Sequence, residues 1–213
     1  AVVVGGVDFS GGLEHVFLHH QKEAINNNDA PSISLNKNDT GWLVGEGAGA
    51  IVLKRKKDSI QQKVYASIES INDQSQHLDV GYQELVASGF QQEDAEELHH
   101  LLDTQQKQPV ALGSVKATIG NTHAASGIAS IIKTALCIHH RFIPAIPNWE
   151  APKQADAFKK TKYYFPRVSK PWLLYQGQDS RKAAVNLPGG GHLLLKESEQ
   201  YHPKESPLIN GRF

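Results

Sequence analysis

The chain has 213 residues, enough for one domain with a substantial core or for two small ones. Its 22 Lys and Arg residues balance 22 Asp and Glu residues, so no excess of positive charge exists to attract nucleic acid. No apolar run reaches the roughly 18 residues of a membrane helix, and the single cysteine excludes an internal disulfide framework. We therefore expect a cytoplasmic protein without nucleic-acid or membrane partners.

The first residues are typical of a strand rather than of a targeting signal. Residues 1–7 form a continuous apolar run, as in a strand buried on both faces. No charged region precedes this run as it would in a secretory signal, and the sequence contains no methionine. We expect a piece of a longer polypeptide that begins in the middle of a fold.

Strands and helices are predicted to alternate along the rest of the chain. Before the polar, irregular segment 72–92, the predicted elements are a helix over 13–25, a glycine-rich approach to a buried strand over 42–53, and a strand over 64–71. After it follow a helix over 93–102, a strand over 110–116, a turn at 118–122, a helix over 124–140, a connection over 144–182 and two short strands over 182–196. This order indicates a layered α/β domain with a mixed sheet.

The segment from Gly113 to Trp149 is the most informative, because a strand there delivers a polar turn to the start of a helix rich in small residues. Ligands often collect at such turns, where unpaired N–H groups and the helix dipole converge. The segment closely resembles the block G-S-V-K-S-N-I-G-H-x-x-x-A-A-G of the β-ketoacyl synthases of fatty-acid and polyketide assembly lines. Lys116 matches the lysine of that block, but Asn121 stands where the family has a catalytic histidine.

Four blocks in order resemble the C-terminal portion of such a ketosynthase: residues 1–8, 40–54, 110–147 and 183–196. The second reads T-G-W-L-V-G-E-G-A-G-A-I-V-L-K, similar to the family's D-G-F-V-x-G-E-G-A-G-x-x-V-L-K. The resemblance implies a thiolase-like αβαβα fold with mixed five-stranded sheets. It places residues 1–63 at the end of the N-terminal half, residues 64–196 in the C-terminal half, and residues 197–213 at the start of a linker.

Departures from the family pattern concern its chemistry. The family's cysteine nucleophile lies upstream of the strand at which this chain starts, and its first histidine, in H-G-T-G-T, corresponds to residues 85–90, which contain no histidine. The second histidine position holds Asn121, whose amide donates a hydrogen bond but does not carry a proton near neutral pH. The family's G-F-G-G turn is reduced to P-G-G-G at 188–191.

Three further candidate residues each have a structural and a functional interpretation. Lys116 is either a retained active-site residue or a structural lysine that pairs with a carboxylate such as Glu46, and we expect its ammonium to reach Glu46 or a backbone carbonyl. His123, two residues after Asn121, points in a different direction from the turn and is disfavoured as a replacement base. Cys137 lies in the middle of a predicted helix, so we expect a buried, inert thiol.

Histidines occur in pairs, and His15 and His19 have the i, i+4 spacing of a helical metal pair. No cysteine or acidic third ligand accompanies them at the spacing of a known metal motif. We therefore predict no metal site and no bound cofactor.

Taken with the resemblance, these departures favour a chain-length factor, a ketosynthase-like domain without its own condensation chemistry, most like that of multidomain polyunsaturated fatty-acid synthases. By resemblance, it pairs with an active ketosynthase and shapes the tunnel for an acyl chain held on the phosphopantetheine of acyl carrier protein. The alternatives are an active β-ketoacyl synthase whose cysteine lies outside this chain, and a purely structural dimerisation module. The catalytic positions under this hypothesis are Lys116 and Asn121, the latter as a relic.

Overall fold

The computed structural model describes residues 1–59, 62–72, 79–104 and 106–198. The predicted linker start at 197–213 lies almost entirely outside these residues. The strands are β1 Val2–Asp8, β2 Gly47–Leu53, β3 Ser67–Asn72, β4 Tyr82–Glu84, β5 Val110–Gly113, β6 Phe142–Ile143, β7 Tyr163–Tyr164, β8 Lys170–Pro171, β9 Lys182–Asn186 and β10 His192–Lys196. The helices are α1 Leu13–His20, α2 Gln91–Asp103, α3 Lys116–Ile119, α4 Ser126–His140 and α5 Ala155–Phe158, with 3₁₀ turns η1 Lys56–Asp58 and η2 His123–Ala125.

A mixed sheet forms the centre of the molecule, with strand order β3-β10-β9-β4-β5-β7. Strand β4 runs parallel to both β5 and β9, while β10 is antiparallel to β9 and β3. The predicted mixed sheet is therefore confirmed. It has six strands where five were expected, because the two-residue strand β7 extends the edge beside β5.

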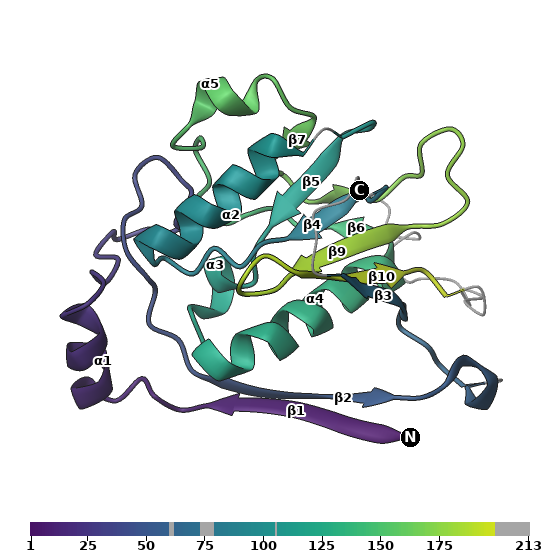
Figure 1. Cartoon of the computed structure of the whole chain (residues 1–213), viewed down its shortest axis with the longest axis horizontal. Coiled ribbons are helices and arrows are strands. Elements are labelled where there is room, and N and C mark those ends of the chain that lie inside the picture. Colours follow the sequence, from purple (N-terminus) through teal and green to yellow (C-terminus); the bar gives the residue numbers. More distant parts are fainter. Residues whose placement is uncertain (60–61, 73–78, 105, 199–213) are drawn as a thin grey trace, which may run out of the picture.

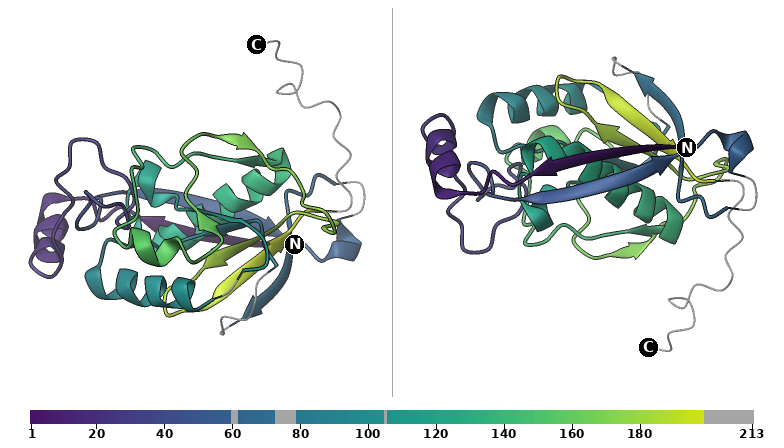
Figure 2. Two further views of the ribbon diagram at one scale, coloured as in Figure 1. Left: turned by 90° about the horizontal axis from the view of Figure 1, so that it is seen from above. Right: turned by 90° about the horizontal axis from the view of Figure 1, so that it is seen from below.

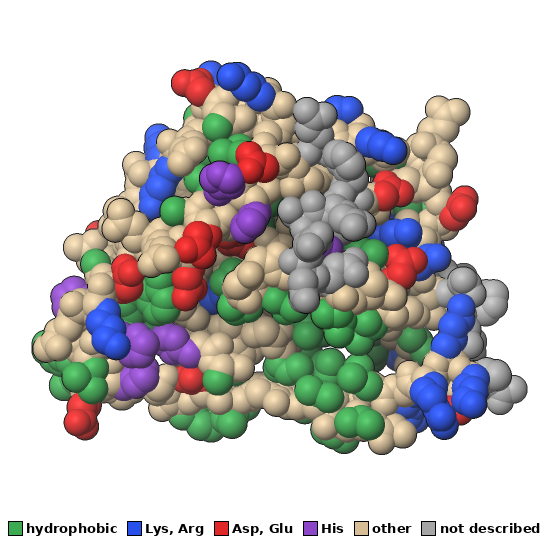
Figure 3. Space-filling view, in the orientation of Figure 1, with side chains coloured by type: hydrophobic (Ala, Val, Ile, Leu, Met, Phe, Trp, Pro, Cys, Tyr) green, Lys and Arg blue, Asp and Glu red, His purple; other side chains and the backbone are tan. Residues whose placement is uncertain are grey.

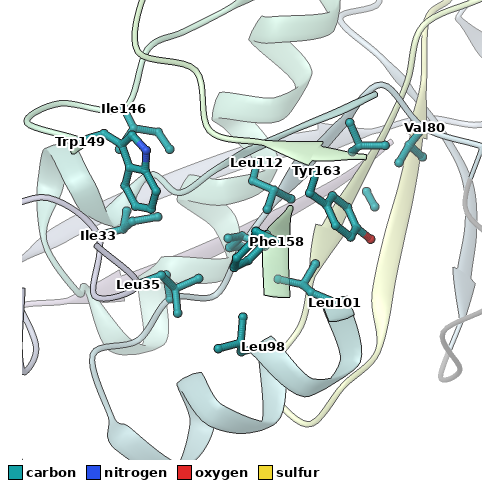
Figure 4. Close-up of a cluster of buried hydrophobic side chains, with 14 residues drawn as sticks. Ile33, Leu35, Val80, Leu98, Leu101, Leu112, Ile146, Trp149, Phe158 and Tyr163 are labelled. Carbon is teal, nitrogen blue, oxygen red and sulfur yellow. The ribbon is translucent and has the colours of Figure 1, made fainter. Parts of the chain in front are cut away.

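The two faces of this sheet carry two separate cores, as the alternation of side chains along a strand requires. On one face, Leu112 and Ala184 pack with Leu98 and Leu101 of α2 in the cluster drawn in Figure 4. On the other face, their strand neighbours pack against α4: Tyr82, Ala111, Ala183 and Val185 meet Cys137 and Ile138. Burial on both faces explains why these short strands are almost wholly apolar or small.

A fourth layer lies beyond α4. Strands β1 and β2 pair antiparallel from Val2–Leu53 to Asp8–Gly47, and the resulting ribbon contacts α4. Figure 1 shows the succession of α2, sheet, α4 and ribbon, and Figure 2 shows the ribbon crossing α4. None of the helices in the described part of the chain combines the length and the apolarity that a bilayer crossing requires.

Two predictions about individual strands were wrong. Strand β1 was expected to be buried on both faces, yet Val3 is 70% exposed and Val2 62% exposed, although β2, η2 and α4 lie against the strand. Segment 72–92 was expected to be irregular, yet β4 within it is buried at the centre of the sheet. Strand β4 could not be recognised in the sequence because the strand has only three residues, two of which are the polar Gln83 and Glu84.

Glu84 is stabilised in this position by three donors. Its carboxylate is fully buried and accepts hydrogen bonds from the Tyr82 hydroxyl at 2.5 Å and the Val115 amide at 2.5 Å. The Lys133 ammonium of α4 lies 2.8 Å from the same carboxylate. Burial and the neighbouring Glu84 carboxylate raise the pKa of Tyr82 well above its usual value, so this hydroxyl stays a donor.

We expect Glu84→Leu to lower the free energy of unfolding of the complete domain by about 3–5 kcal/mol, because it leaves the Lys133 ammonium without its partner. Urea denaturation measures the change. The matched control is Asp156→Asn, which breaks the exposed pair with Lys159 and should change stability by about 0–1 kcal/mol. Equal effects of the two substitutions would contradict the role given to Glu84.

Candidate functional site

The polar turn after β5 lies beside the loop 85–90 after β4, and these are the two segments that the resemblance relates to the histidines of the family. Lys116 does not end the strand, as predicted, but begins α3, and it is 6% exposed. Its ammonium donates to the Val86 carbonyl at 2.5 Å. Val86 lies in the loop 85–90 after β4, so Lys116 anchors this loop to the turn after β5.

Asn121 forms a second link between the same two segments. It is 4% exposed, and its Nδ2 donates to the Ser88 carbonyl at 3.0 Å. Its Oδ1 accepts from the backbone N–H of His123 at 3.1 Å and from the Ser126 hydroxyl at 3.2 Å. The side chain therefore fixes the loop after β4, the turn itself and the start of α4 in one arrangement.

The turn can approach its neighbours this closely because of Gly120. Its φ is +75°, and a Cβ added there would lie 2.4 Å from the Val44 carbonyl oxygen. The Asn121 amide N–H donates to the Leu43 carbonyl at 2.8 Å. The G-E-G-A-G approach to β2 thus packs directly on the turn, which explains why both segments keep their glycines.

Glu97 of α2 holds the loop 85–90 from the other side. Its carboxylate accepts the backbone N–H groups of Val86 and Ala87, both at 2.8 Å, and Asn186 Nδ2 at 2.7 Å. Burial raises the pKa of Glu97, although these hydrogen bonds oppose the shift. Sequence reasoning missed this residue, whose only local signal is an acidic position on the sheet-facing side of α2.

The polar side chains of the site bind the backbone of the neighbouring loop. Burial lowers the pKa of Lys116, while the carboxylates of Glu97 and Glu84 oppose the shift. Of the two partners considered for Lys116, the carbonyl is present, and Glu46 instead accepts from the Gly11 amide at 2.8 Å. The Lys116 ammonium and the Asn121 amide both donate to backbone carbonyls of the loop 85–90.

We expect Lys116→Met to lower the free energy of unfolding by about 1–3 kcal/mol, because the buried Val86 carbonyl loses its donor. Thermal or urea denaturation measures the loss. Lys162→Met is the matched control, since the Lys162 ammonium donates to the Lys107 carbonyl at the surface and its loss should change stability by less than about 0.5 kcal/mol. A Lys116→Met variant as stable as the control would contradict the anchoring role.

Beside the turn, three imidazoles gather where the sequence predicts only a pair. His15 and His19 share one face of α1, and His123 of η2 completes the group (Figure 3 shows histidines beside α1). The His123 ring lies 4.8 Å from His19 and 5.4 Å from the Trp42 ring, centroid to centroid. Burial lowers the pKa values of both His19 and His123.

An apolar groove of about 630 Å³ runs between β2, α3 and α4. Its walls are mainly small and aliphatic: Gly47, Gly49, Ile119, Ala129, Ile132 and Leu136. Cys137 contributes to the same wall from inside the second core, and burial raises the pKa of its thiol to about 11, which agrees with the predicted inert cysteine.

Comparison with known proteins identifies the family. The profile of the β-ketoacyl synthase C-terminal domain matches residues 40–150, and that of the N-terminal domain matches residues 1–59. The chain belongs to the β-ketoacyl synthase family.

Among the relatives of this ketosynthase-family chain is a component of the polyunsaturated fatty acid synthase of Thraustochytrium sp., 30% identical over 96% of this chain and 12% of that protein. Polyketide synthase PksL of Bacillus subtilis is 29% identical over 78% of this chain and 4% of that protein. The chain thus spans a small part of the relatives it matches.

Solved structures confirm the thiolase-like ketosynthase fold. A ketosynthase from module 6 of the bacillaene synthase of Bacillus subtilis 168 superposes with a TM-score of 0.76 and 26% identity, covering 92% of this chain and 42% of that one. An oxazolomycin ketosynthase domain from Streptomyces albus gives a TM-score of 0.78 at 22% identity, covering 96% of this chain and 43% of that one.

Proposed function

We propose that this chain is part of a chain-length-factor domain of a polyunsaturated fatty-acid or polyketide synthase. In this role the domain pairs with an active β-ketoacyl synthase and helps to shape the tunnel for the growing acyl chain. The acyl chain is carried on the phosphopantetheine of acyl carrier protein, and the domain itself binds no organic cofactor. We assign residues 1–63 to the first half of the domain and residues 64–196 to the second.

The observation that carries the proposal is the bond between Asn121 and Ser88. It joins Asn121, which stands at the second histidine position of the resemblance, to the loop 85–90, which corresponds to the segment with the first histidine, through an amide and a carbonyl. Val86 of the same loop is fixed by Lys116 and Glu97. These hydrogen bonds hold the loop and the turn in place although both imidazoles are absent. This favours a role in pairing with a ketosynthase and in shaping the tunnel over a role in catalysis.

The relatives support the class of assembly. The Thraustochytrium protein is named as part of a polyunsaturated fatty-acid synthase, and the Bacillus protein as a polyketide synthase. An active synthase remains the alternative, and it would be favoured by a cysteine at the nucleophile position upstream of β1.

A domain exchange tests the assigned role. The partner ketosynthase is assayed with this domain and with the corresponding domain of a synthase that makes products of different length. We expect product length to follow the exchanged domain, while the rate of condensation changes less. Product length that follows the ketosynthase alone, whichever domain accompanies it, would contradict a chain-length factor and favour a structural dimerisation module.

A further inference from the structure

The three histidines beside the turn form a cluster that the proposed function does not use. His15 and His19 project from one face of α1, and His123 faces them from η2. One nitrogen from each ring lies within 4.8 Å of the others, and all three residues are half-buried. The ring centroids of His15 and His19 are 4.3 Å apart. Imidazole nitrogens in such a group are typical ligands of divalent transition metals.

One of these nitrogens has no protein partner. His15 Nε2 is buried and makes no hydrogen bond within the described part of the chain. Buried polar atoms are normally paired with protein, water or an ion, so His15 Nε2 is available to bind an ion.

The backbone at His123 supports the same interpretation. His123 has a φ of +38°, a left-handed conformation that non-glycine residues adopt infrequently. Asn121 Oδ1 holds its N–H, and Asp8 Oδ2 accepts from the next N–H, that of Ala124, at 3.4 Å. The unusual conformation is therefore fixed by neighbours, and it directs the ring toward α1.

The surroundings resemble those of a metal centre. The rings of Trp42 and Phe90 lie against the histidines, with centroid distances from 5.4 to 6.3 Å, and exclude solvent on that side. The Asp8 carboxylate lies close to His123 and supplies negative charge outside the ligand set. Such apolar walls and outer carboxylates tune the affinity of metal sites.

We propose that His15, His19 and His123 bind a divalent transition-metal ion, with Zn²⁺ as the ion they fit best and water in a fourth position. Zinc–nitrogen bonds of about 2.0–2.1 Å place the nitrogens of tetrahedral ligands about 3.3 Å apart. The three histidine nitrogens lie within 4.8 Å of one another, so side-chain rotation must shorten the longest nitrogen–nitrogen distance by roughly 1.5 Å. The ion fastens α1, which has no buried residue of its own, to the turn that carries Asn121. The sequence alone conceals the site because His123 is far from the pair along the chain.

The test is a titration of the complete protein, freed of metal and without a histidine tag, with Zn²⁺ in a calorimeter. We expect a site of one ion per chain, and we expect His15→Ala, His19→Ala and His123→Asn each to weaken binding by at least about 100-fold, more than the loss of an outer-shell group. Asparagine at 123 tolerates positive φ, so this variant keeps the turn while it removes the ligand. His99→Ala, at an exposed histidine elsewhere, is the control and should leave affinity unchanged.

A second readout separates coordination from unfolding. Co²⁺ in place of Zn²⁺ should give visible d–d absorption of the intensity typical of a four-coordinate site, and His123→Asn should abolish it while its melting temperature without metal stays near that of the wild type. Zn²⁺ should also raise the melting temperature of the wild type and of His99→Ala but not of the other variants. Equal zinc affinity of the wild type and His123→Asn, or a wild type without a site, would overturn the proposal.

Discussion

Condensation of an acyl chain with malonyl units is expected to stay at background when the complete domain is assayed with the nucleophile of its partner ketosynthase removed. The two positions that supply imidazoles in condensing relatives hold Asn121 and the loop around Val86, which contains no titrating side chain. A catalytic acid–base group typically contributes about 10²–10⁴-fold. The loss of two such groups therefore removes the proton transfer and the oxyanion stabilisation on which decarboxylative condensation depends.

The measurement is the release of carbon dioxide and the formation of 3-oxoacyl carrier protein by the paired domains. The intact pair is the positive control, and the pair whose ketosynthase lacks its nucleophile is the test sample. His99→Ala in the intact pair should leave turnover unchanged, because the His99 side chain is exposed on α2 and pairs with Asp103. If the test sample turned over nearly as fast as the intact pair, this domain would catalyse condensation itself and the prediction would be refuted.

Much of the fold could be predicted, because many of its helices and strands have a clear local sequence pattern. The glycine-rich approach to β2, the run 110–113, the small-residue helix α4 and the last two strands were all expected near their observed places. Each combines a periodic apolar pattern with glycine or polar residues at its ends, so propensity and tertiary context agree.

The rest could not be predicted because it depends on contacts between distant segments. Strand β4 has three residues and is stabilised by Glu84 pairing with Lys133 of α4, which no local pattern encodes. Likewise, the sequence could not decide between Glu46 and a backbone carbonyl as the partner of Lys116, because a carbonyl carries no side-chain signal. The pairing of His15 and His19 follows from helical spacing, but the approach of His123 follows from a strained turn.

Lys116 and Asn121 could be predicted only in part. The resemblance singled out both as candidate catalytic positions, and the structure places both beside the loop after β4. Their roles as relic catalytic positions stay a prediction, since geometry shows what they bind and not what they once did.

An apolar surface remains open on the outer layer of this chain. Strands β1 and β2 expose a row of valines, among them Val3 at 70% and Val52 at 62%, and the apolar groove beside α4 adjoins them (Figure 3). At roughly 25 cal/mol per Å², leaving about 400 Å² of such surface in water forgoes stabilisation on the order of 10 kcal/mol. That is comparable to the whole stability of a typical domain.

We therefore propose that the ribbon and groove pack against the complementary half of a ketosynthase-like domain, which adds the fifth layer to the four seen here. Residues 1–213 expressed alone should self-associate or melt without cooperativity, and co-expression with the upstream half or the partner ketosynthase should give a defined complex with a higher melting temperature. Light scattering after size exclusion and thermal denaturation measure both effects. Val3→Lys, on the exposed ribbon, should weaken the complex, whereas Val168→Lys, comparably exposed but outside the ribbon, should not. A chain that is monomeric and cooperatively folded by itself, and that gains neither binding nor stability from either partner, would show that these valines face solvent in the native protein.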